Sequence, residues 1–324
     1  MYRSMPPEYQ IPSLMPDYAN VDSFRDTRHK QVFWIYSKSS FKCLRSFHVI
    51  TTVISGWGEI KDIEYPYGYG GVICTSRNGI LRAQAHQEFC AWAHEENILV
   101  EFCRIHPLLT RQQDFFPYKQ RNRDVVCIDL ADDIISGYQR RRRSYIRTEI
   151  KKDIRLICAK SDAEMALFKS LYAETMRRAD AQKFYFFNDQ YYEGLFRLDT
   201  TKLWLIYYAG LPLAGAIVLE SENSRVAEYH LGAYVISNNH RPMETLLHLI
   251  AEHYKSRQFR YFYLGGGRST SDNDTLLNFK RGFSKNLLQF DVGFNVFNAA
   301  KYDKLRLASE TPCHSTRVIF YREH

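Results

Sequence analysis

The sequence predicts a mixed α+β protein built from two units of similar organisation. At 324 residues and 38.2 kDa the chain exceeds what one core usually holds, and its 45% hydrophobic residues supply enough apolar surface for two cores. The same order of elements, several strands followed by a helix and a further strand, occurs in each half. We therefore expect an N-terminal extension at residues 1–29 and two like domains at 30–153 and 154–324.

The first half contains strand-type runs at residues 32–36, 43–54 and 60–72, a helical run at 81–94 and a last strand-type run at 98–105. In the segment YPYGYGG, at 65–71, glycines alternate with aromatic residues. A tight turn ending a strand is one interpretation. The other is the rim of a binding site, where Tyr67, Tyr69 and exposed backbone N–H groups contact a polar substrate.

A strongly basic segment joins the two halves. Seven Lys and Arg residues against two acidic residues leave seven minus two, or +5, over residues 140–153. Apolar residues between Ile134 and Ile150 recur at helical spacing, which predicts one amphipathic helix with Asp129 as its N-cap. The segment is either a solvated helix face between domains or an electropositive rim above a phosphate-bearing substrate.

In the second half, Ser161 and Glu164 have the spacing of a capping box, which predicts the start of a helix. A helical run at 191–198 precedes two strands, 203–208 and 214–219, joined by a turn at 209–212. A strand at 225–235, a helix opened by Pro242 and a strand at 259–264 follow. We expect Gly282 to end a last helix as its left-handed C′ residue.

Composition and missing motifs exclude several classes of protein. The sequence has no P-loop, Rossmann, zincin or nucleophile-elbow motif, and no apolar run that could span a membrane. Seven cysteines without a C-x-x-C pair predict free thiols, and the N-terminus lacks a signal-peptide pattern, so we expect a cytoplasmic protein. The net charge of +8 favours anionic partners.

One helical spacing could hold a metal ion. Glu244, His248 and Glu252 stack at i, i+4 and i+8, but we expect them to form a solvated face opposite the apolar stripe of their helix. We therefore assign no metal ligands.

Several short motifs occur in a fixed order along the chain. They are YPYGYGG at 65–71, TMRR at 175–178, AGA at 214–216, YHLGA at 229–233, LGGG at 264–267 and FKRGFS at 279–284. In this order they resemble the Fem-type transferases, which are tandem GNAT-fold proteins that include peptidoglycan-bridge aminoacyltransferases and acyltransferases of envelope-polysaccharide clusters. The resemblance covers roughly residues 30–300. It implies two GNAT-like domains, with the active cleft mainly in the second, and transfer of an acyl or aminoacyl group to an amine of a cell-envelope precursor.

The resemblance also implies site residues: Phe279 and Lys280 match the Phe-Lys pair at the active cleft, and Arg178 matches the arginine of the helix motif. Attack of an amine on a thioester or ester carbonyl creates an oxyanion that needs preorganised donors. We expect the Lys280 ammonium group to face a hollow beside that charge. The other candidates are Tyr229 and His230 for proton handling, and Gly265, Gly266, Gly267 and Arg268 for substrate binding.

Strand alternation allows only one of Tyr229 and His230 to face the cleft. A buried role satisfied by the backbone is the alternative for either residue.

The donor stays open at this point. GNAT enzymes that use acyl-CoA carry a glycine-rich pyrophosphate loop, whereas residues 237–242 here read SNNHRP. Asn239 and Arg241, at the start of a helix, are candidate cofactor-binding residues because free N–H groups attract phosphate. We expect acyl-CoA or aminoacyl-tRNA as cosubstrate and no tightly bound cofactor.

The expected acceptor is a phosphate-bearing small molecule or a lipid-linked intermediate, with possible peripheral membrane contact; the oligomeric state is open. Two other functions compete with this one: a non-catalytic RNA- or anionic-surface-binding protein, and a small-amine acetyltransferase.

Overall fold

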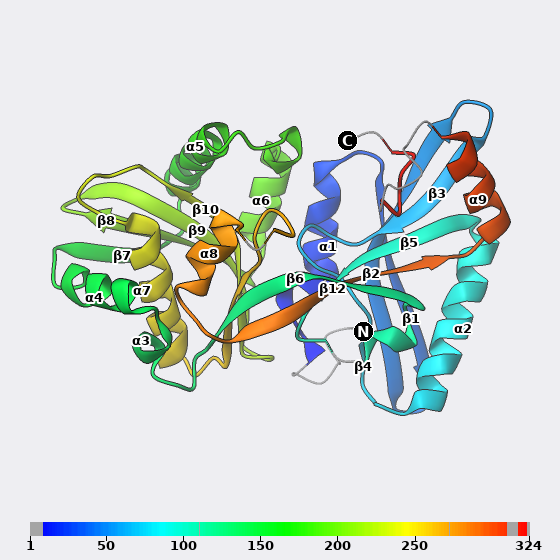
Figure 1. Cartoon of the computed structure of the whole chain (residues 1–324), viewed down its shortest axis with the longest axis horizontal. Helices are drawn as coiled ribbons and strands as arrows, with labels where there is room; N and C mark the ends of the chain where they lie inside the picture. Colours follow the sequence, from blue (N-terminus) through cyan, green and yellow to red (C-terminus); the bar gives the residue numbers. More distant parts are fainter. Residues whose placement is uncertain (1–8, 110, 272, 310–316, 323–324) are drawn as a thin grey trace. The chain divides into compact units, whose positions relative to one another are not determined.

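The computed structural model describes residues 9–109, 111–271, 273–309 and 317–322, which belong to two compact units (Figure 1). Unit 1 comprises Met1–Asn122 and Phe290–His324, and unit 2 comprises Arg123–Gln289. The chain passes from one unit to the other within β6 (Tyr118–Asp129) and returns within β12 (Leu287–Val296). These bounds differ from the predicted ranges, because residues 291–296 pair with a strand of the first half and so join unit 1.

Unit 1 is a mixed sheet in the order β1-β2-β3-β5-β12 with helices packed against it. Only β3 and β5 run parallel, and the short β4 pairs with β2. α2 contacts β1, β2 and β5. The elements are η3 (Pro12–Leu14), α1 (Pro16–Asp22), η4 (Ser23–Arg25), β1 (His29–Lys38), β2 (Phe41–Ile54), β3 (Gly58–Glu64), β4 (Ile73–Cys74), α2 (Gly79–Glu95), β5 (Ile98–Ile105), η5 (Gln112–Asp114) and α9 (Ala299–Ala308).

The strands of unit 2 follow the order β6-β11-β10-β9-β8-β7. β10 and β11 are parallel, and the other neighbours are antiparallel. The elements are α3 (Ile134–Gly137), α4 (Arg140–Glu149), β7 (Ile154–Ala159), α5 (Asp162–Arg178), η6 (Lys183–Tyr185), α6 (Asp189–Arg197), β8 (Thr201–Tyr208), β9 (Leu211–Ser221), β10 (Val226–Tyr234), α7 (Pro242–Ser256), β11 (Tyr261–Gly265) and α8 (Thr275–Arg281).

The helices of unit 2 cover both faces of its sheet (Figure 1). A Cβ atom on Gly215 of β9 would meet Phe168 of α5, so this residue faces α5. Its neighbours Ala214 and Ala216 are buried in the core cluster that contains Leu246 and Leu247 of α7. Since successive residues of a strand point to opposite faces, α5 and α7 lie on opposite sides of the sheet.

Several local predictions are confirmed. The Ser161 hydroxyl accepts a hydrogen bond from the Glu164 backbone, and the Glu164 carboxylate accepts one from the Ser161 backbone, which completes the capping box. Ala209 and Gly210 both have positive φ between β8 and β9, as a two-residue hairpin turn requires. Cysteines of the described ranges are free thiols, whereas Cys313 lies outside them. None of the helices in those ranges has the length and hydropathy that crossing a membrane would need.

The predicted basic helix is wrong as a single element. Asp129 ends β6, Asp133 caps α3, and Tyr138 has an extended backbone (φ −75°, ψ 150°) that separates α3 from α4. The Tyr138 side chain is buried, and its hydroxyl forms a 3.1 Å hydrogen bond with Nδ1 of His248. The solvated face predicted for Glu244, His248 and Glu252 is therefore wrong at His248, whose side chain packs inside the unit.

Gly282 is also placed differently from the prediction. Its φ is −65°, so it is right-handed and its conformation does not require glycine. The buried guanidinium group of Arg142 lies against it instead, and a Cβ atom at Gly282 would lie 2.2 Å from Arg142 Nη1. Glycine is needed here for close packing.

Candidate active site

The candidate site begins where β10 and β11 stop pairing. Residues 226–228 of β10 pair with residues 261–263 of β11, and β10 then continues to Tyr234 paired with β9 alone. β11 ends at Gly265, where it pairs with Val126 of β6. The two parallel neighbours thus separate after Glu228, and the residues that follow in each strand line their point of divergence.

Lys280 lies close to that point. Its Nζ donates a 2.7 Å hydrogen bond to the Gly266 carbonyl oxygen, and it lies 5.5 Å from the centroid of the Tyr229 ring. Lys280 is only 6% exposed, so the prediction that its ammonium group faces a hollow is wrong. Burial lowers the pKa of Lys280 to about 7, although the charge of Asp274 raises it. Lys280 therefore exchanges its proton near neutral pH.

Each glycine after β11 has a structural reason. Gly265 has a φ of +76°, which favours glycine, and a Cβ atom on Gly266 would lie 3.1 Å from Val125. A Cβ atom on Gly267 would lie 2.1 Å from Oδ1 of Asp274. The Asp274 carboxylate caps α8 through Leu277 N and accepts hydrogen bonds from the next two backbone N–H groups, those of Arg268 and Ser269. The Asp274 carboxylate therefore lies against Gly267 and the two residues that follow it.

Tyr229 and His230 face opposite sides of the sheet. The Tyr229 ring covers Gly232, and its hydroxyl lies 4.0 Å from Met243 Sδ at the start of α7. His230 is the extra residue where the β9–β10 register shifts, and its Nε2 lies 2.7 Å from the hydroxyl of the buried Tyr191 on α6. Tyr229 thus shares the surroundings of Lys280, whereas His230 belongs to the face that α6 covers.

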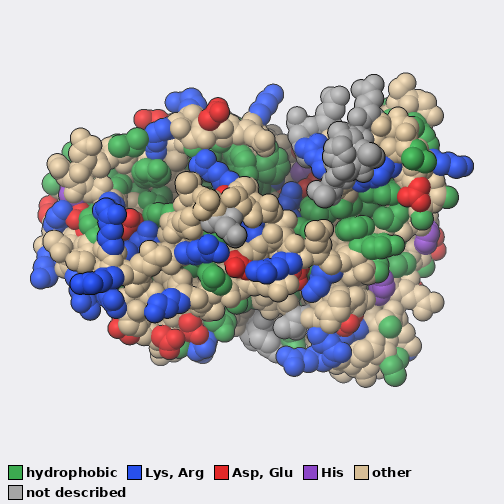
Figure 2. All heavy atoms as spheres, viewed as in Figure 1, with side chains coloured by type: hydrophobic (Ala, Val, Ile, Leu, Met, Phe, Trp, Pro, Cys, Tyr) green, Lys and Arg blue, Asp and Glu red, His purple; other side chains and the backbone are tan. Residues whose placement is uncertain are grey.

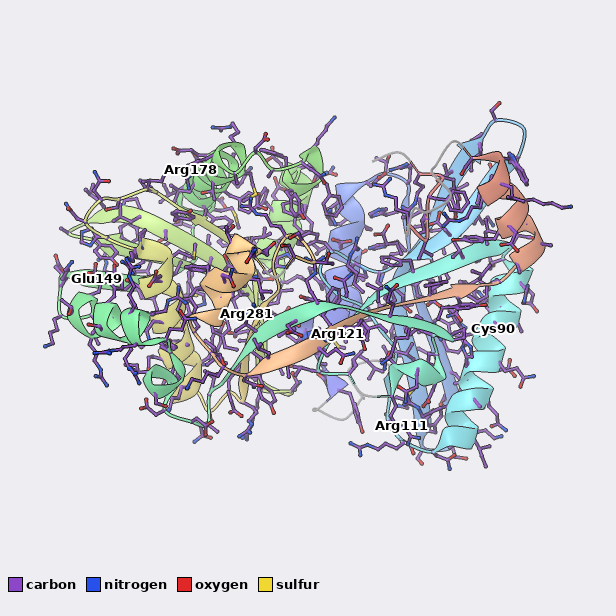
Figure 3. The ribbon with its side chains drawn as sticks, in the orientation of Figure 1. Cys90, Arg111, Arg121, Glu149, Arg178 and Arg281 are labelled. Atoms are coloured by element: carbon purple, nitrogen blue, oxygen red, sulfur yellow. The ribbon has the colours of Figure 1, made fainter. Side chains whose placement is uncertain are left out.

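Arg178, Arg268 and Phe279 have protein partners. Arg178, labelled in Figure 3, donates from Nη2 to the Tyr234 carbonyl oxygen at 2.9 Å. Arg268 donates to the Ala179 carbonyl oxygen just beyond α5. The Phe279 carbonyl oxygen accepts a 2.6 Å hydrogen bond from Arg142, whose guanidinium group also lies over the Phe279 ring. These three contacts connect α5 with β10, the residues after Gly267 with the end of α5, and α4 with α8.

Tyr67 and Tyr69 lie in unit 1. The Tyr67 carbonyl oxygen accepts a 2.8 Å hydrogen bond from the Tyr18 hydroxyl, and the Arg25 guanidinium group lies 4.8 Å from the centre of the Tyr67 ring. The Tyr69 ring packs edge-on against His106. The strand predicted at 60–72 ends at Glu64, as β3. Residues 65–71 form a turn instead, with positive φ at Gly68 and Gly71.

A basic hollow lies at the start of α7. It has a volume of about 550 Å³ and is lined by Arg140, Arg141, Ser144, Tyr145 and Arg241. Figure 2 shows Lys and Arg side chains gathered on the face over α4. The Tyr145 hydroxyl accepts a 2.6 Å hydrogen bond from the Arg241 backbone, and the Arg241 guanidinium group lies over the Tyr145 ring. The sequence analysis named Arg241 and the basic segment at 140–153 as separate candidates. It did not predict that Ser144 and Tyr145 of that segment line a hollow together with Arg241.

A smaller hollow of about 300 Å³ adjoins the same arginines. Gln139, Arg141, Arg142, Arg241 and Glu244 line it. Arg142 pairs with Glu244 of α7 at 3.1 Å and also binds the carbonyl oxygen of the residue before Lys280. The buried Arg142 therefore connects the basic surface with α8. Asn239 is exposed, and its backbone N–H donates to Ser237; neither hollow is lined by it.

Comparison with known proteins finds a family model that matches most of unit 2. Residues 137–281 match the family model of the acetyltransferase (GNAT) domain. No curated protein matches the sequence.

Solved structures share the fold at low sequence identity. FemX is 12% identical with a TM-score of 0.69, over 90% of this chain and 94% of FemX. The C-terminal domain (DUF2156) of a putative lysylphosphatidylglycerol synthetase from Agrobacterium fabrum is 12% identical with a TM-score of 0.58, over 89% of each chain. L-PGS from Bacillus licheniformis is 14% identical with a TM-score of 0.59, over 91% of this chain and 97% of that one.

These likenesses and the mixed sheet with its flanking helices confirm the predicted α+β class with tandem GNAT-like organisation. The predicted acyltransferase class and the resemblance to Fem-type transferases are confirmed as well. Residues 137–281 are similar to the GNAT acetyltransferase domain, within a chain that has the fold of FemX.

Proposed function

We propose that this acyltransferase moves an acyl or aminoacyl group from a phosphate-bearing donor onto an amine of a cell-envelope precursor. The basic hollow at the start of α7 is the observation that carries the proposal. Its position supports this use because α7 directly follows β10, the strand that separates from β11 beside Lys280. The fold shared with FemX and with L-PGS favours an envelope component as the acceptor.

The donor phosphates would bind Arg140, Arg141 and Arg241. Helix α7 adds to this attraction because Arg241, its N-cap residue, forms no side-chain cap, which leaves backbone N–H groups of the first turn to meet an anion. Acyl-CoA and aminoacyl-tRNA both present phosphates followed by a reactive carbonyl, so this chemistry accepts either.

Lys280 and Tyr229 would act on the carbonyl under attack. Nucleophilic attack by the acceptor nitrogen places negative charge on the carbonyl oxygen, and a protonated Lys280 stabilises that charge strongly in a site with little water. The hydrogen bond to Gly266 holds its Nζ at the end of β11. The Tyr229 hydroxyl is a second donor on the same side of the sheet. His230 has no part in this step, because it faces α6.

Product analysis with defined donors and acceptors tests the proposal. The protein is incubated with acetyl-CoA, longer acyl-CoAs or aminoacyl-tRNA, each with amino-sugar nucleotides, lipid-linked amines or small free amines, and product masses are read. We expect one donor class to give an envelope-type product. Transfer only to small amines would favour the small-amine acetyltransferase. Tight RNA binding without transfer to any acceptor would favour the non-catalytic alternative.

Variants separate donor binding from chemistry. Arg141→Ala with Arg241→Ala should raise the KM for the donor at least about tenfold with little change in kcat, because these arginines would contact only phosphate. Arg197→Ala, on an arginine with an 81% exposed side chain, is the matched control and should change neither constant. Lys280→Met should abolish turnover. An unchanged KM in the double variant would contradict the assignment of the hollow.

A further inference from the structure

Three side chains with metal-ligating atoms meet in unit 1, outside the GNAT domain. Asp22 ends α1, His29 begins β1 and His48 lies in the middle of β2. One candidate ligand atom from each residue lies within 4.8 Å of those of the other two. The β1–β2 register places His48 opposite Gln31, two residues from His29, so both imidazoles stand on one face of the sheet.

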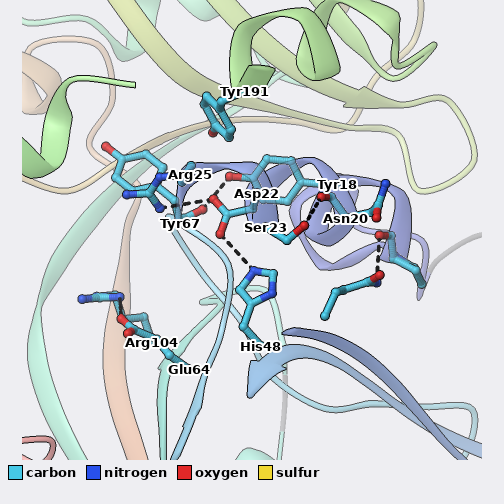
Figure 4. A network of polar contacts seen from close by, with 12 residues as sticks. Tyr18, Asn20, Asp22, Ser23, Arg25, His48, Glu64, Tyr67, Arg104 and Tyr191 are labelled. Atoms are coloured by element: carbon cyan, nitrogen blue, oxygen red, sulfur yellow. Dashed lines mark hydrogen bonds and ion pairs between the residues drawn. The ribbon is translucent and has the colours of Figure 1, made fainter. Parts of the chain in front are cut away.

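The cluster is buried, and part of its hydrogen-bonding capacity is unused. Asp22 and His48 are each 1% exposed, and Asp22 Oδ2 lies 3.1 Å from His48 Nε2 (Figure 4). Within the described part of the chain, Nδ1 of His29 and Nδ1 of His48 are both buried without a hydrogen-bond partner. Buried polar atoms are nearly always paired, so two unpaired imidazole nitrogens side by side call for an explanation.

We propose that Asp22, His29 and His48 form a zinc site. Two imidazoles and a carboxylate from three different elements are a ligand set that zinc binds in a tetrahedral arrangement, with water as the fourth ligand. Ligand atoms in such a site are about 3.4 Å apart, given metal–ligand distances of about 2.1 Å. The oxygen of Asp22 and Nε2 of His48 already have nearly this separation.

The remaining groups fit this arrangement. Asp22 uses its second oxygen, Oδ1, to pair with Arg25 at 3.2 Å, so the carboxylate stays oriented while Oδ2 binds the ion. Without a metal, the Asp22 carboxylate favours the proton of His48 on Nε2; with zinc on Nε2, the neutral imidazole would carry that proton on Nδ1, which has no other partner.

His29 is the ligand that must move. The two rings are stacked 4.7 Å apart at an angle of 10°, and parallel rings cannot direct their lone pairs at one point. His29 is partly exposed, and zinc binding requires its imidazole to turn out of this stack.

Metal binding to the full chain tests this proposal. The protein is stripped with EDTA, desalted, titrated with ZnSO4 and measured for zinc content and for thermal stability. We expect one zinc ion per chain at this site and a higher melting temperature that EDTA reverses. His29→Gln and Asp22→Asn should each weaken zinc binding at least tenfold, whereas His94→Gln, at an exposed histidine of α2, should bind zinc like the parent.

Cobalt substitution gives a second readout that does not depend on how well each variant folds. Co²⁺ bound by two imidazoles and a carboxylate gives visible bands of a four- or five-coordinate ion, without the near-ultraviolet charge-transfer band of a thiolate ligand. A thiolate band would assign the metal to cysteines and overturn the proposal. Equal zinc affinity in the parent, His29→Gln and Asp22→Asn would also overturn it, as would the absence of zinc binding to the parent.

Discussion

Replacing Lys280 with Met should make the protein more stable at neutral pH while it abolishes transfer. Burial lowers the pKa of this amine from 10.5 to about 7 in the folded protein, so the folded state binds a proton less tightly than the unfolded chain. At pH 7 this difference costs roughly 4 kcal/mol of folding free energy. Methionine removes that cost and loses a hydrogen bond to Gly266 worth about 1 kcal/mol, so we expect a net gain of roughly 3 kcal/mol.

The pH dependence identifies the cause of that gain. Between pH 7 and 10.5 the unfolded chain keeps the Lys280 proton that the folded state has released, so the stability of the parent rises with pH relative to the variant. The advantage of Lys280→Met should therefore be largest at or below pH 7 and should be lost near pH 10, where the missing hydrogen bond to Gly266 offsets what remains of it.

Urea-denaturation midpoints at pH 7, 8, 9 and 10 measure this difference. Lys285→Met, at an exposed position, is the control and should show no such trend. A difference between parent and Lys280→Met that stays constant with pH would refute the reasoning, since it would mean that the folded state does not perturb this amine.

Other expected outcomes concern the same unit. If protonated Lys280 stabilises the oxyanion, kcat should fall as the pH rises through about 7, the pKa of this amine. Lys280→Arg should move the fall in kcat to higher pH, and a pH–rate profile of both proteins measures this. Gly282→Ala should cost about 1–3 kcal/mol in urea denaturation, because its Cβ would displace Arg142, whereas Gly79→Ala, with open space around it, should cost nothing. Ser161→Ala should cost about 1 kcal/mol through loss of the helix cap, and an unchanged melting temperature would contradict this.

The sequence predicted those features that local residue patterns determine. The capping box at Ser161 and the hairpin turn at Ala209 and Gly210 depend on neighbours within a few positions, and the structure has them as expected. Alternation also predicted that only one of Tyr229 and His230 faces the cleft, although His230 stands at a register shift that local sequence does not reveal.

Features that depend on distant contacts could not be predicted in this way. Tyr138 interrupts a good helical pattern because its ring fills a core site beside His248, 110 residues later in the chain. Gly282 is small because Arg142 occupies the space beside it. The burial of Lys280 follows from where α8 meets the end of β11, which no local pattern of residues records.

The passage of the chain through β6 and β12 has a consequence for synthesis on the ribosome. Unit 2 is one continuous stretch, whereas the β5–β12 ladder of unit 1 needs residues made after unit 2 is finished. We expect nascent chains whose residues have left the exit tunnel as far as 289 to hold a protease-resistant unit 2 while their earlier residues are still digested. Protection of unit 1 should begin only once residues 291–296 have also left the tunnel, so the later-encoded unit matures before the half that precedes it.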